Sequence, residues 1–152
     1  MQKILNFIGG AMLEPVSGAY FENEDPSTGK SYSLVPDSDE KDLELAVAAA
    51  KKAFLVWRDM PAAQRAAIMH RLADLIEKNQ EEFIRAESVD NGKPLSLCRA
   101  VDIPRAIANL RFFADAGKDF HGDVFKSDKA ESYTLRQPFG VVAIISPWNL
   151  PL

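Results

Sequence analysis

The stretch that decides the fold is Val141-Val142-Ala143-Ile144-Ile145-Ser146-Pro147-Trp148-Asn149, close to the end of the 152-residue sequence. Its first five residues are rich in β-branched side chains and contain no polar residue, which predicts a strand buried on both faces of a parallel sheet. In doubly wound α/β sheets, ligands bind beyond the carboxyl ends of the strands. The pattern therefore places Trp148 and Asn149 where a ligand site would lie. The alternative is a surface turn in which Asn149 hydrogen-bonds its own backbone.

The composition is that of a folded protein with no affinity for nucleic acids or membranes. Hydrophobic residues make up 47% of the chain and charged residues 26%, as in globular domains. The formal net charge of -4 gives no attraction to phosphate backbones or anionic lipid. The first ten residues are too polar for a signal peptide, and no apolar run is long enough to cross a bilayer. A single cysteine allows no internal disulfide, so we expect a cytoplasmic location.

Short strands are expected in the first part of the chain. Brief apolar or aromatic runs occur at residues 6–8, 19–22 and 32–35. They are separated by turn-forming residues, notably Gly9-Gly10 and Asp25-Pro26-Ser27-Thr28-Gly29.

Helices are expected from Asp39 onwards. An apolar stripe from Leu43 to Trp57 predicts a helix that is capped by Asp37, Ser38 or Asp39 and ends before Pro61. The second helix has its predicted stripe at Ile68, Leu72, Leu75 and Ile76.

A third helix, over residues 81–89, is expected to stop at Asn91-Gly92. A fourth, from Leu95 to Ala116, contains Pro104 and is expected to kink near Asp102. Beyond Gly117, the alternation from Ser132 to Arg136 predicts one more strand.

These motifs, in their order and spacing, resemble the aldehyde dehydrogenase superfamily. Residues 133–152 are similar to the family's approach to its Pro-Trp-Asn motif, and the turn at 25–29 resembles its Asn-Pro-x-Thr-Gly turn, with Asp in place of Asn. The helix containing Ala46, Val47, Ala50, Phe54 and Trp57, the pair Gln64-Arg65 and the segment from Glu87 to Pro94 also fit. Residues 102–105, 111–114 and 145–152 look closest to the 2-amino- and 2-hydroxymuconic semialdehyde dehydrogenases, which oxidise products of aromatic ring cleavage.

The resemblance implies an incomplete α/β fold in three parts. Residues 1–122 would form the N-terminal strands and the helical part of the cofactor-binding domain. Residues 123–137 would form one strand of an oligomerisation arm, which implies a homo-oligomer when the protein is full length. Residues 138–152 would form the first buried strand and the Pro-Trp-Asn turn of the doubly wound, Rossmann-like cofactor domain.

The resemblance also implies a mechanism for a small aldehyde substrate. In the family, a cysteine thiolate attacks the aldehyde to give a thiohemiacetal, hydride passes to the nicotinamide, and a glutamate-activated water hydrolyses the thioester. Asn149 matches the asparagine that donates to the thiohemiacetal oxyanion. Ile145, Ser146, Pro147, Trp148 and Asn149 match positions that line the nicotinamide-ribose end of the cofactor. NAD is the expected cofactor, with NADP left open, and no metal is expected.

The nucleophilic cysteine and the base glutamate of the family would lie downstream of residue 152, so we expect the chain alone to be inactive. Cys98 is expected to be a buried structural thiol, because no histidine or lysine lies near it in the sequence to lower its pKa. Neither His70 nor His121 has a second ligand-type residue at metal spacing.

Two other functions compete with this one. The amphipathic helices between Asp39 and Ala116 would suit a non-catalytic helical interaction module or a decayed dehydrogenase, but such a module has no use for the element from Val141 to Asn149. A CoA-acylating relative would keep the enzyme class and change the chemistry. Without parallel neighbours, residues 141–145 are expected to be exposed and aggregation-prone.

Overall fold

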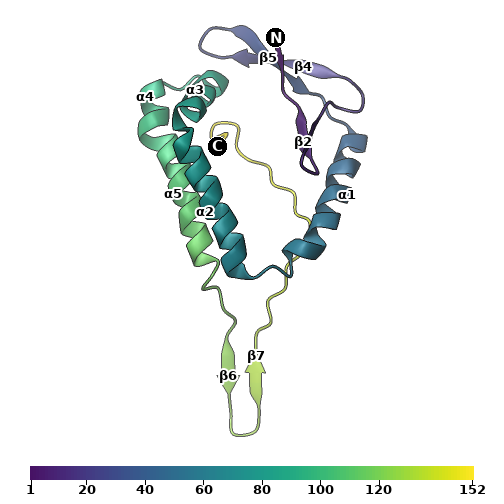
Figure 1. Ribbon diagram of the computed structural model, residues 1–152, viewed down its shortest axis with the longest axis vertical. Helices are drawn as coiled ribbons and strands as arrows, with labels where there is room; N and C mark the ends of the chain where they lie inside the picture. The colour runs from purple at the N-terminus through teal and green to yellow at the C-terminus, as the bar shows by residue number, and fades with distance from the viewer.

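The computed structural model describes residues 1–152 as three small sheets and a set of helices (Figure 1). The strands are β1 (Gln2–Lys3), β2 (Asn6–Ile8), β3 (Ala11–Leu13), β4 (Tyr20–Asp25), β5 (Lys30–Pro36), β6 (Val124–Lys126) and β7 (Glu131–Tyr133). The helices are α1 (Glu40–Trp57), α2 (Ala62–Lys78), α3 (Gln80–Asn91), α4 (Leu95–Leu97), the π-helical turn η1 (Cys98–Asp102) and α5 (Ile103–Ala116).

The N-terminal sheet has the order β1-β5-β4, with β4 antiparallel and β1 parallel to the central strand β5. The predicted turn at residues 25–29 connects β4 to β5. The Asp25 carboxylate accepts from the Ser27 amide at 2.8 Å, and the Asp25 carbonyl accepts from the Gly29 amide at 2.8 Å. The sequence did not indicate β1, because its two residues are fixed only by pairing with Ser33 and Leu34.

Strands β2 and β3 form a tight hairpin around Gly9 and Gly10. Both glycines have positive φ, 61° and 87°, which a two-residue hairpin turn with the twist of its strands requires. The turn and β2 were predicted from the sequence, whereas β3 was not.

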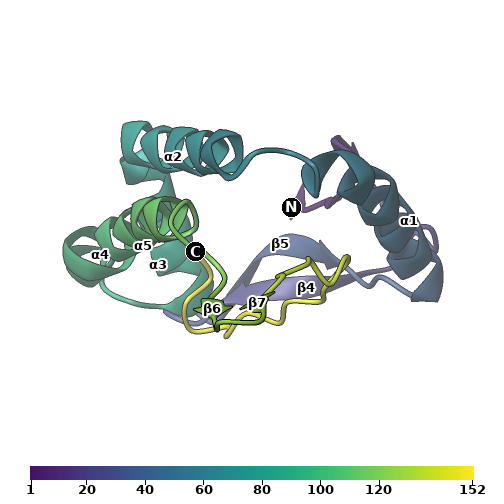
Figure 2. The same cartoon turned by 90° about the horizontal axis from the view of Figure 1, so that it is seen from below.

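Helix α1 begins as the sequence predicts, with Asp39 as its cap. The Asp39 side chain accepts from the Lys41 amide at 2.9 Å, and Asp42 reaches back to the Asp39 amide to complete a capping box. The predicted apolar stripe is not buried, since Leu43 and Trp57 at its two ends are exposed. The reason is visible in Figure 2, where α1 stands apart from α2, α3 and α5. It packs on β2 instead.

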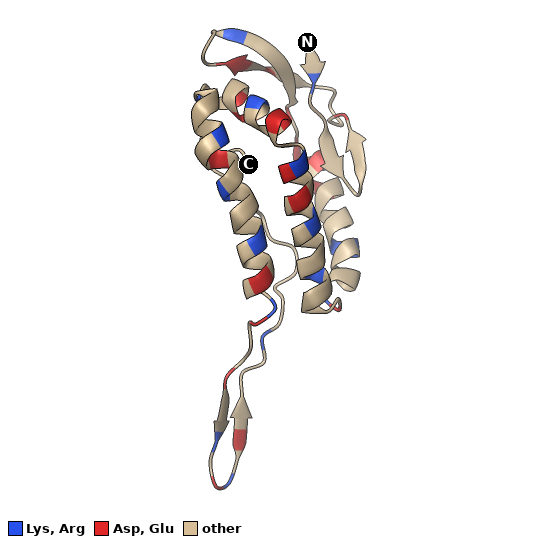
Figure 3. Ribbon diagram, turned by 60° about the vertical axis from the view of Figure 1, so that its left-hand side comes forward, with Lys and Arg blue, Asp and Glu red and all other residues tan.

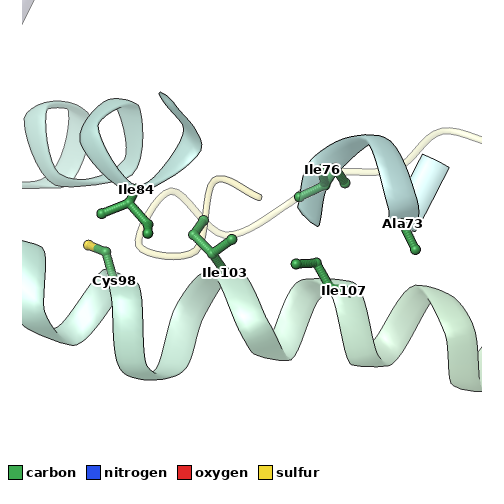
Figure 4. Close-up of a cluster of buried hydrophobic side chains, with 6 residues drawn as sticks. All are labelled: Ala73, Ile76, Ile84, Cys98, Ile103 and Ile107. Carbon is green, nitrogen blue, oxygen red and sulfur yellow. The ribbon is translucent and has the colours of Figure 1, made fainter. Parts of the chain in front are cut away.

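Helices α2 and α5 run antiparallel and pack side by side (Figure 1). The core lies between them and α3, and consists of Ala73, Ile76, Ile84, Cys98, Ile103 and Ile107 (Figure 4). The stripe predicted for α2 is wrong in part, because Ile68, Leu72 and Leu75 are exposed. The buried positions of α2 are Ala66, Ala73 and Ile76. Small alanine side chains on this face let α5 pack close to α2. A prediction based on the large apolar residues alone therefore selects the wrong face.

The predicted irregularity before Pro104 is confirmed. Between α4 and α5 the backbone forms the π-helical turn η1, in which the Ile103 amide donates to the Cys98 carbonyl five residues earlier. Proline cannot donate to the carbonyl four residues before it, and its ring clashes with that carbonyl. A wider turn next to Pro104 accommodates both effects.

Strands β6 and β7 form a hairpin that projects far from the helices (Figure 3). Of the strand predicted over residues 132–136, only Ser132 and Tyr133 belong to β7. After the hairpin, the chain returns between α1 and α2 towards the N-terminal sheet (Figure 1). None of the helices combines the length and apolar character needed to cross a membrane.

Candidate functional site

The Pro-Trp-Asn motif forms a β-turn. The Leu150 amide donates to the Pro147 carbonyl at 3.1 Å, which places Trp148 and Asn149 at the two central positions. Both side chains are exposed, with 85% of Trp148 accessible. The Asn149 carboxamide therefore points from a tight turn at the surface of this chain.

The strand predicted over residues 141–145 does not form in this structure. The segment is extended but pairs with no other strand, and Ile145 is 96% exposed. The correction has a simple cause, because a strand buried on both faces needs parallel neighbours and covering helices. The exposure of residues 141–145 agrees with what the sequence predicts for a chain without those neighbours.

The segment that returns from the hairpin contacts two apolar grooves. Gly140, Val141 and Val142 lie against α1, where they share a groove with Phe54 and Trp57. Further along, Leu152 lies at a groove between α2 and α5 whose lining is mostly apolar. The turn at residues 147–150 thus lies between the segment that contacts α1 and the end of the chain, which contacts α2 and α5.

The residues predicted to line a nicotinamide cofactor do not form a pocket. Ile145, Ser146, Pro147, Trp148 and Asn149 are contiguous and exposed, and none of them lines any of the five main cavities. Their hydroxyl, indole and carboxamide groups suit the ribose and amide of such a cofactor, but nothing opposite them closes a site. No chemical step at a cofactor follows from the geometry of these exposed residues.

Cys98 is fully buried, in agreement with the sequence prediction. Burial raises the pKa of its thiol, and the negative charges of Asp102 and Glu87 raise it further. A thiol held protonated inside an apolar cluster is a poor nucleophile. Cys98 thus has the burial and the raised pKa expected of a structural thiol.

A buried ionic cluster lies beside Cys98. Lys93 Nζ is 3.2 Å from Glu87 Oε1 and 3.0 Å from Asp102 Oδ2. Desolvation lowers the pKa of Lys93, but the hydrogen bonds to Asp102 and Glu87 outweigh it and leave the pKa raised. The ammonium group is therefore charged at all physiological pH values.

The sequence analysis noted the segment from Glu87 to Pro94 but assigned it no role. No helical spacing links Lys93 to Asp102, because Lys93 lies in the loop after α3 and Asp102 ends the π-helical turn η1. The sequence feature that pointed to this region was Pro104, because a proline within a helix predicts a distortion there.

A second polar cluster joins the N-terminal sheet to α3. Asp90 Oδ1 accepts from the Tyr32 hydroxyl at 2.8 Å and from Asn23 Nδ2 at 3.1 Å. Desolvation, together with the hydrogen bond to Asp90, raises the pKa of Tyr32. Both clusters tie secondary-structure elements together, and Tyr32, Glu87 and Asp90 line a cavity that also includes Pro151 and Leu152, the two residues after the Pro-Trp-Asn turn.

The two histidines lie apart. His70 Nε2 is 3.0 Å from Asp115 Oδ1 in an exposed pair between α2 and α5, and His121 lies in the loop before β6. No group of three metal-ligating side chains comes together in the structure.

Comparison with known proteins gives the class. The aldehyde dehydrogenase family profile matches residues 13–152, so the chain belongs to the aldehyde dehydrogenase family. Its α/β fold, with strands, a helical layer and a projecting hairpin, is that of the family's solved members. A P. syringae indole-3-acetaldehyde dehydrogenase mutant, solved in complex with NAD+ and IAA, superposes with a TM-score of 0.90 at 35% identity, over 95% of this chain and 30% of that one.

Within the family, the chain is similar to the muconic semialdehyde dehydrogenases. It is 46% identical over 149 residues to 2-aminomuconic semialdehyde dehydrogenase of Bos taurus, and the aligned region covers 97% of this chain and 30% of the relative. It is 40% identical over 158 residues to 2-hydroxymuconic semialdehyde dehydrogenase of Pseudomonas sp. (strain CF600), covering 100% and 32%. The chain thus spans about a third of the length of these relatives.

Proposed function

We propose that this chain serves as the N-terminal portion of an NAD(P)-dependent aldehyde dehydrogenase that oxidises a small semialdehyde of the muconic type to its acid. Family membership supports the reaction, and the similarity to the two muconic semialdehyde dehydrogenases supports the substrate class. The complex of the P. syringae relative with NAD+ supports NAD as the cofactor. The cytoplasmic location expected from the sequence stays a prediction.

In this proposal, Asn149 donates a hydrogen bond to the oxyanion of the thiohemiacetal. The observation that carries the role is the turn of residues 147–150, which presents the carboxamide unobstructed at its tip. A fixed amide dipole directed at developing negative charge in a water-poor site contributes about 3–4 kcal/mol to the transition state. The carboxamide does not titrate, so this contribution is independent of pH.

The nucleophile and the base would come from residues other than those of this chain. Cys98 is the only cysteine, and it is buried with a raised pKa. We therefore propose that the chain alone is inactive and that residues 145–149 bind cofactor only when a parallel sheet packs behind residues 141–145.

The projecting hairpin supports a homo-oligomer. Strands β6 and β7 pair only with each other, and their residues, including Phe125 and Tyr133, are exposed. An exposed two-stranded arm with apolar side chains is suited to strand addition or packing in a partner subunit. We propose that the arm, residues 123–137, mediates that assembly.

Two measurements test the catalytic proposal. The purified chain, mixed with NAD+ and 2-hydroxymuconic semialdehyde, is expected to produce no NADH absorbance; turnover would contradict the placement of the nucleophile. In a full-length dehydrogenase carrying this sequence, Asn149→Ala is expected to lower kcat by roughly 10²–10³-fold with little change in NAD+ affinity.

The matched control is Asn109→Ala, which removes an exposed carboxamide from α5 and should leave kcat unchanged. An Asn149→Ala enzyme with normal kcat would remove this residue from the mechanism. A full-length protein without activity on any aldehyde would instead identify a decayed dehydrogenase.

A further inference from the structure

We infer that Glu87, Lys93 and Asp102 form a conformational lock, which keeps the π-helical turn η1 packed against α3 with the side chain of Cys98 buried, and makes the opening of η1 depend on the N-terminal sheet. The lock joins three parts of the chain: α3, the loop that follows it, and the end of η1. It lies outside the proposed catalytic turn and does not depend on the proposed function.

Hydrogen bonds hold both the backbone and the ammonium group of Lys93. Its ammonium lies between two carboxylates, at 3.2 Å and 3.0 Å, and the side chains of Lys93, Glu87 and Asp102 are 20%, 3% and 10% exposed. Its backbone amide donates to Asn91 Oδ1 at 2.9 Å, and its carbonyl accepts from Ser88 Oγ at 2.6 Å. Because both ends are fixed, the long side chain is already positioned for the two carboxylates.

The segment held by the lock is the irregular one. Asp102 ends η1 and Cys98 begins it, and Pro104 has no N–H to donate to the Ala100 carbonyl within η1. π-Helical turns are rare and occur mostly as single turns inside α-helices, so η1 is a local departure from the regular helix on either side of it. On its inner face, η1 contributes Cys98 to the core beside Ile84 and Ile103 (Figure 4). Opening of η1 would therefore expose the Cys98 thiol.

A second ion pair joins the same two elements and provides an internal comparison. Arg99, in η1, donates two hydrogen bonds to Glu81, on α3, at 2.7 Å and 3.2 Å, but both side chains are more than half exposed. Exposed pairs contribute little because water and salt screen them, whereas loss of one partner from a buried pair leaves the other charge uncompensated. We therefore expect substitution of Lys93 to promote the opening of η1 strongly and substitution of Arg99 to promote it little.

Polar contacts continue from the lock to the sheet. Asn91 Nδ2 donates to Glu87 Oε1 at 3.0 Å. Asp90, next to Asn91 on α3, accepts from the hydroxyl of Tyr32 on β5 at 2.8 Å. The end of α3 is therefore held by β5 on one side and by η1, through Lys93, on the other. Loosening of α3 from the sheet should loosen the lock.

The rate at which Ellman's reagent modifies Cys98 tests this inference, because the chain has a single thiol and it is fully buried. Under native conditions, Lys93→Met should speed modification by at least about a hundredfold. The matched control Arg99→Met should change it by less than about threefold. The positive charge of Lys93 lowers the thiol pKa, so its removal makes the thiol less reactive, and a faster rate can only arise from opening.

Tyr32→Phe tests the link to the sheet. The variant removes one hydroxyl and should speed modification by about threefold to tenfold, the usual effect of one lost hydrogen bond; Tyr133→Phe, on the exposed arm, should have no effect. If the Lys93→Met variant loses its helical circular dichroism signal, the test rests on the rate of Cys98 modification in Tyr32→Phe. Equal rates for Lys93→Met and Arg99→Met, no acceleration by Tyr32→Phe, or a wild-type thiol as reactive as in guanidinium chloride would each overturn the inference.

Discussion

A Cβ atom placed on Gly92 would lie 3.0 Å from Cγ of Pro26. Gly92 ends α3 with a φ of 74°, and Pro26 belongs to the turn between β4 and β5. Two turns far apart in the sequence thus meet at a position where only glycine satisfies both the backbone angle and the available space. This contact adds to the hydrogen bonds that join the N-terminal sheet to α3.

We predict that Gly92→Ala lowers the free energy of unfolding by about 2–3 kcal/mol. A left-handed backbone costs a residue with a Cβ about 1–2 kcal/mol, and displacement of the rigid Pro26 ring adds to that cost. Urea unfolding followed by circular dichroism measures the difference. Gly10→Ala is the control, because Gly10 has a φ of 87° but nothing within 4 Å of its Cβ position. A Gly10→Ala loss as large as that of Gly92→Ala would show that Pro26 plays no part.

Asp42→Ala should detach α1 from the N-terminal strands. This buried carboxylate accepts from the Val16 amide at 3.0 Å and from the Asp39 amide at 3.3 Å. Both donors would lose their partner, so we expect a loss of about 2–3 kcal/mol, against about 1 kcal/mol for the cap variant Asp39→Ala. Hydrogen exchange of the α1 amides is the direct readout. Asp37→Ala, an exposed acid just before the helix, should leave exchange unchanged, and protection of α1 in Asp42→Ala would refute the prediction.

The stability of the chain should fall as the pH rises above about 9, and Cys98 should cause part of the fall. Burial, and then the charges of Asp102 and Glu87, raise the pKa of its thiol above the ordinary value of 9.0. Above that value the unfolded chain loses the proton while the folded chain keeps it, so each pH unit costs up to about 1.4 kcal/mol. Urea titrations across this range should show a smaller slope for Cys98→Ala. The raised pKa of Tyr32 acts in the same direction from a higher starting value of 10.0, so the slope should not vanish. Identical slopes would exclude Cys98.

Ile144→Lys should reduce self-association of the chain. Residues 141–145 are extended, unpaired and largely exposed, which makes them a template for pairing with another chain. A lysine in this run opposes such pairing by charge. Static light scattering over a concentration series is the measurement, with Val16→Lys, an exposed loop position, as the control. Equal scattering by Ile144→Lys and the wild type would place the association surface elsewhere.

Much of the local structure could be predicted from the residues themselves. The cap at Asp39, the end of α3 at Gly92 and the irregular turn before Pro104 all appear where expected. Each depends on residues within four or five positions, whose hydrogen bonds and backbone angles are set by local chemistry. The family, too, was evident from the order and spacing of the motifs, and the profile match confirms it.

Burial could not be predicted in the same way. The sequence analysis expected Leu72 and Leu75 in the core of α2, whereas Ala66 and Ala73 are buried. Residues 141–145, which the pattern predicts as a buried strand within a sheet, are exposed here, as the sequence predicts for a chain without parallel neighbours. In both cases the outcome depends on what another part of the structure brings against that face, and hydrophobicity alone does not specify the partner. The roles of Asn149 and its neighbours stay a prediction for the same reason.

The sequence by itself determined the family, the helical region from Asp39 to Ala116 and the Pro-Trp-Asn turn that presents Asn149. Only the tertiary structure decided that Lys93 bridges Glu87 and Asp102, that Tyr32 holds Asp90, and which faces stay uncovered. The physical reason is that turns and caps arise from neighbours along the chain, whereas ion pairs and buried faces require residues far apart in sequence to meet in space.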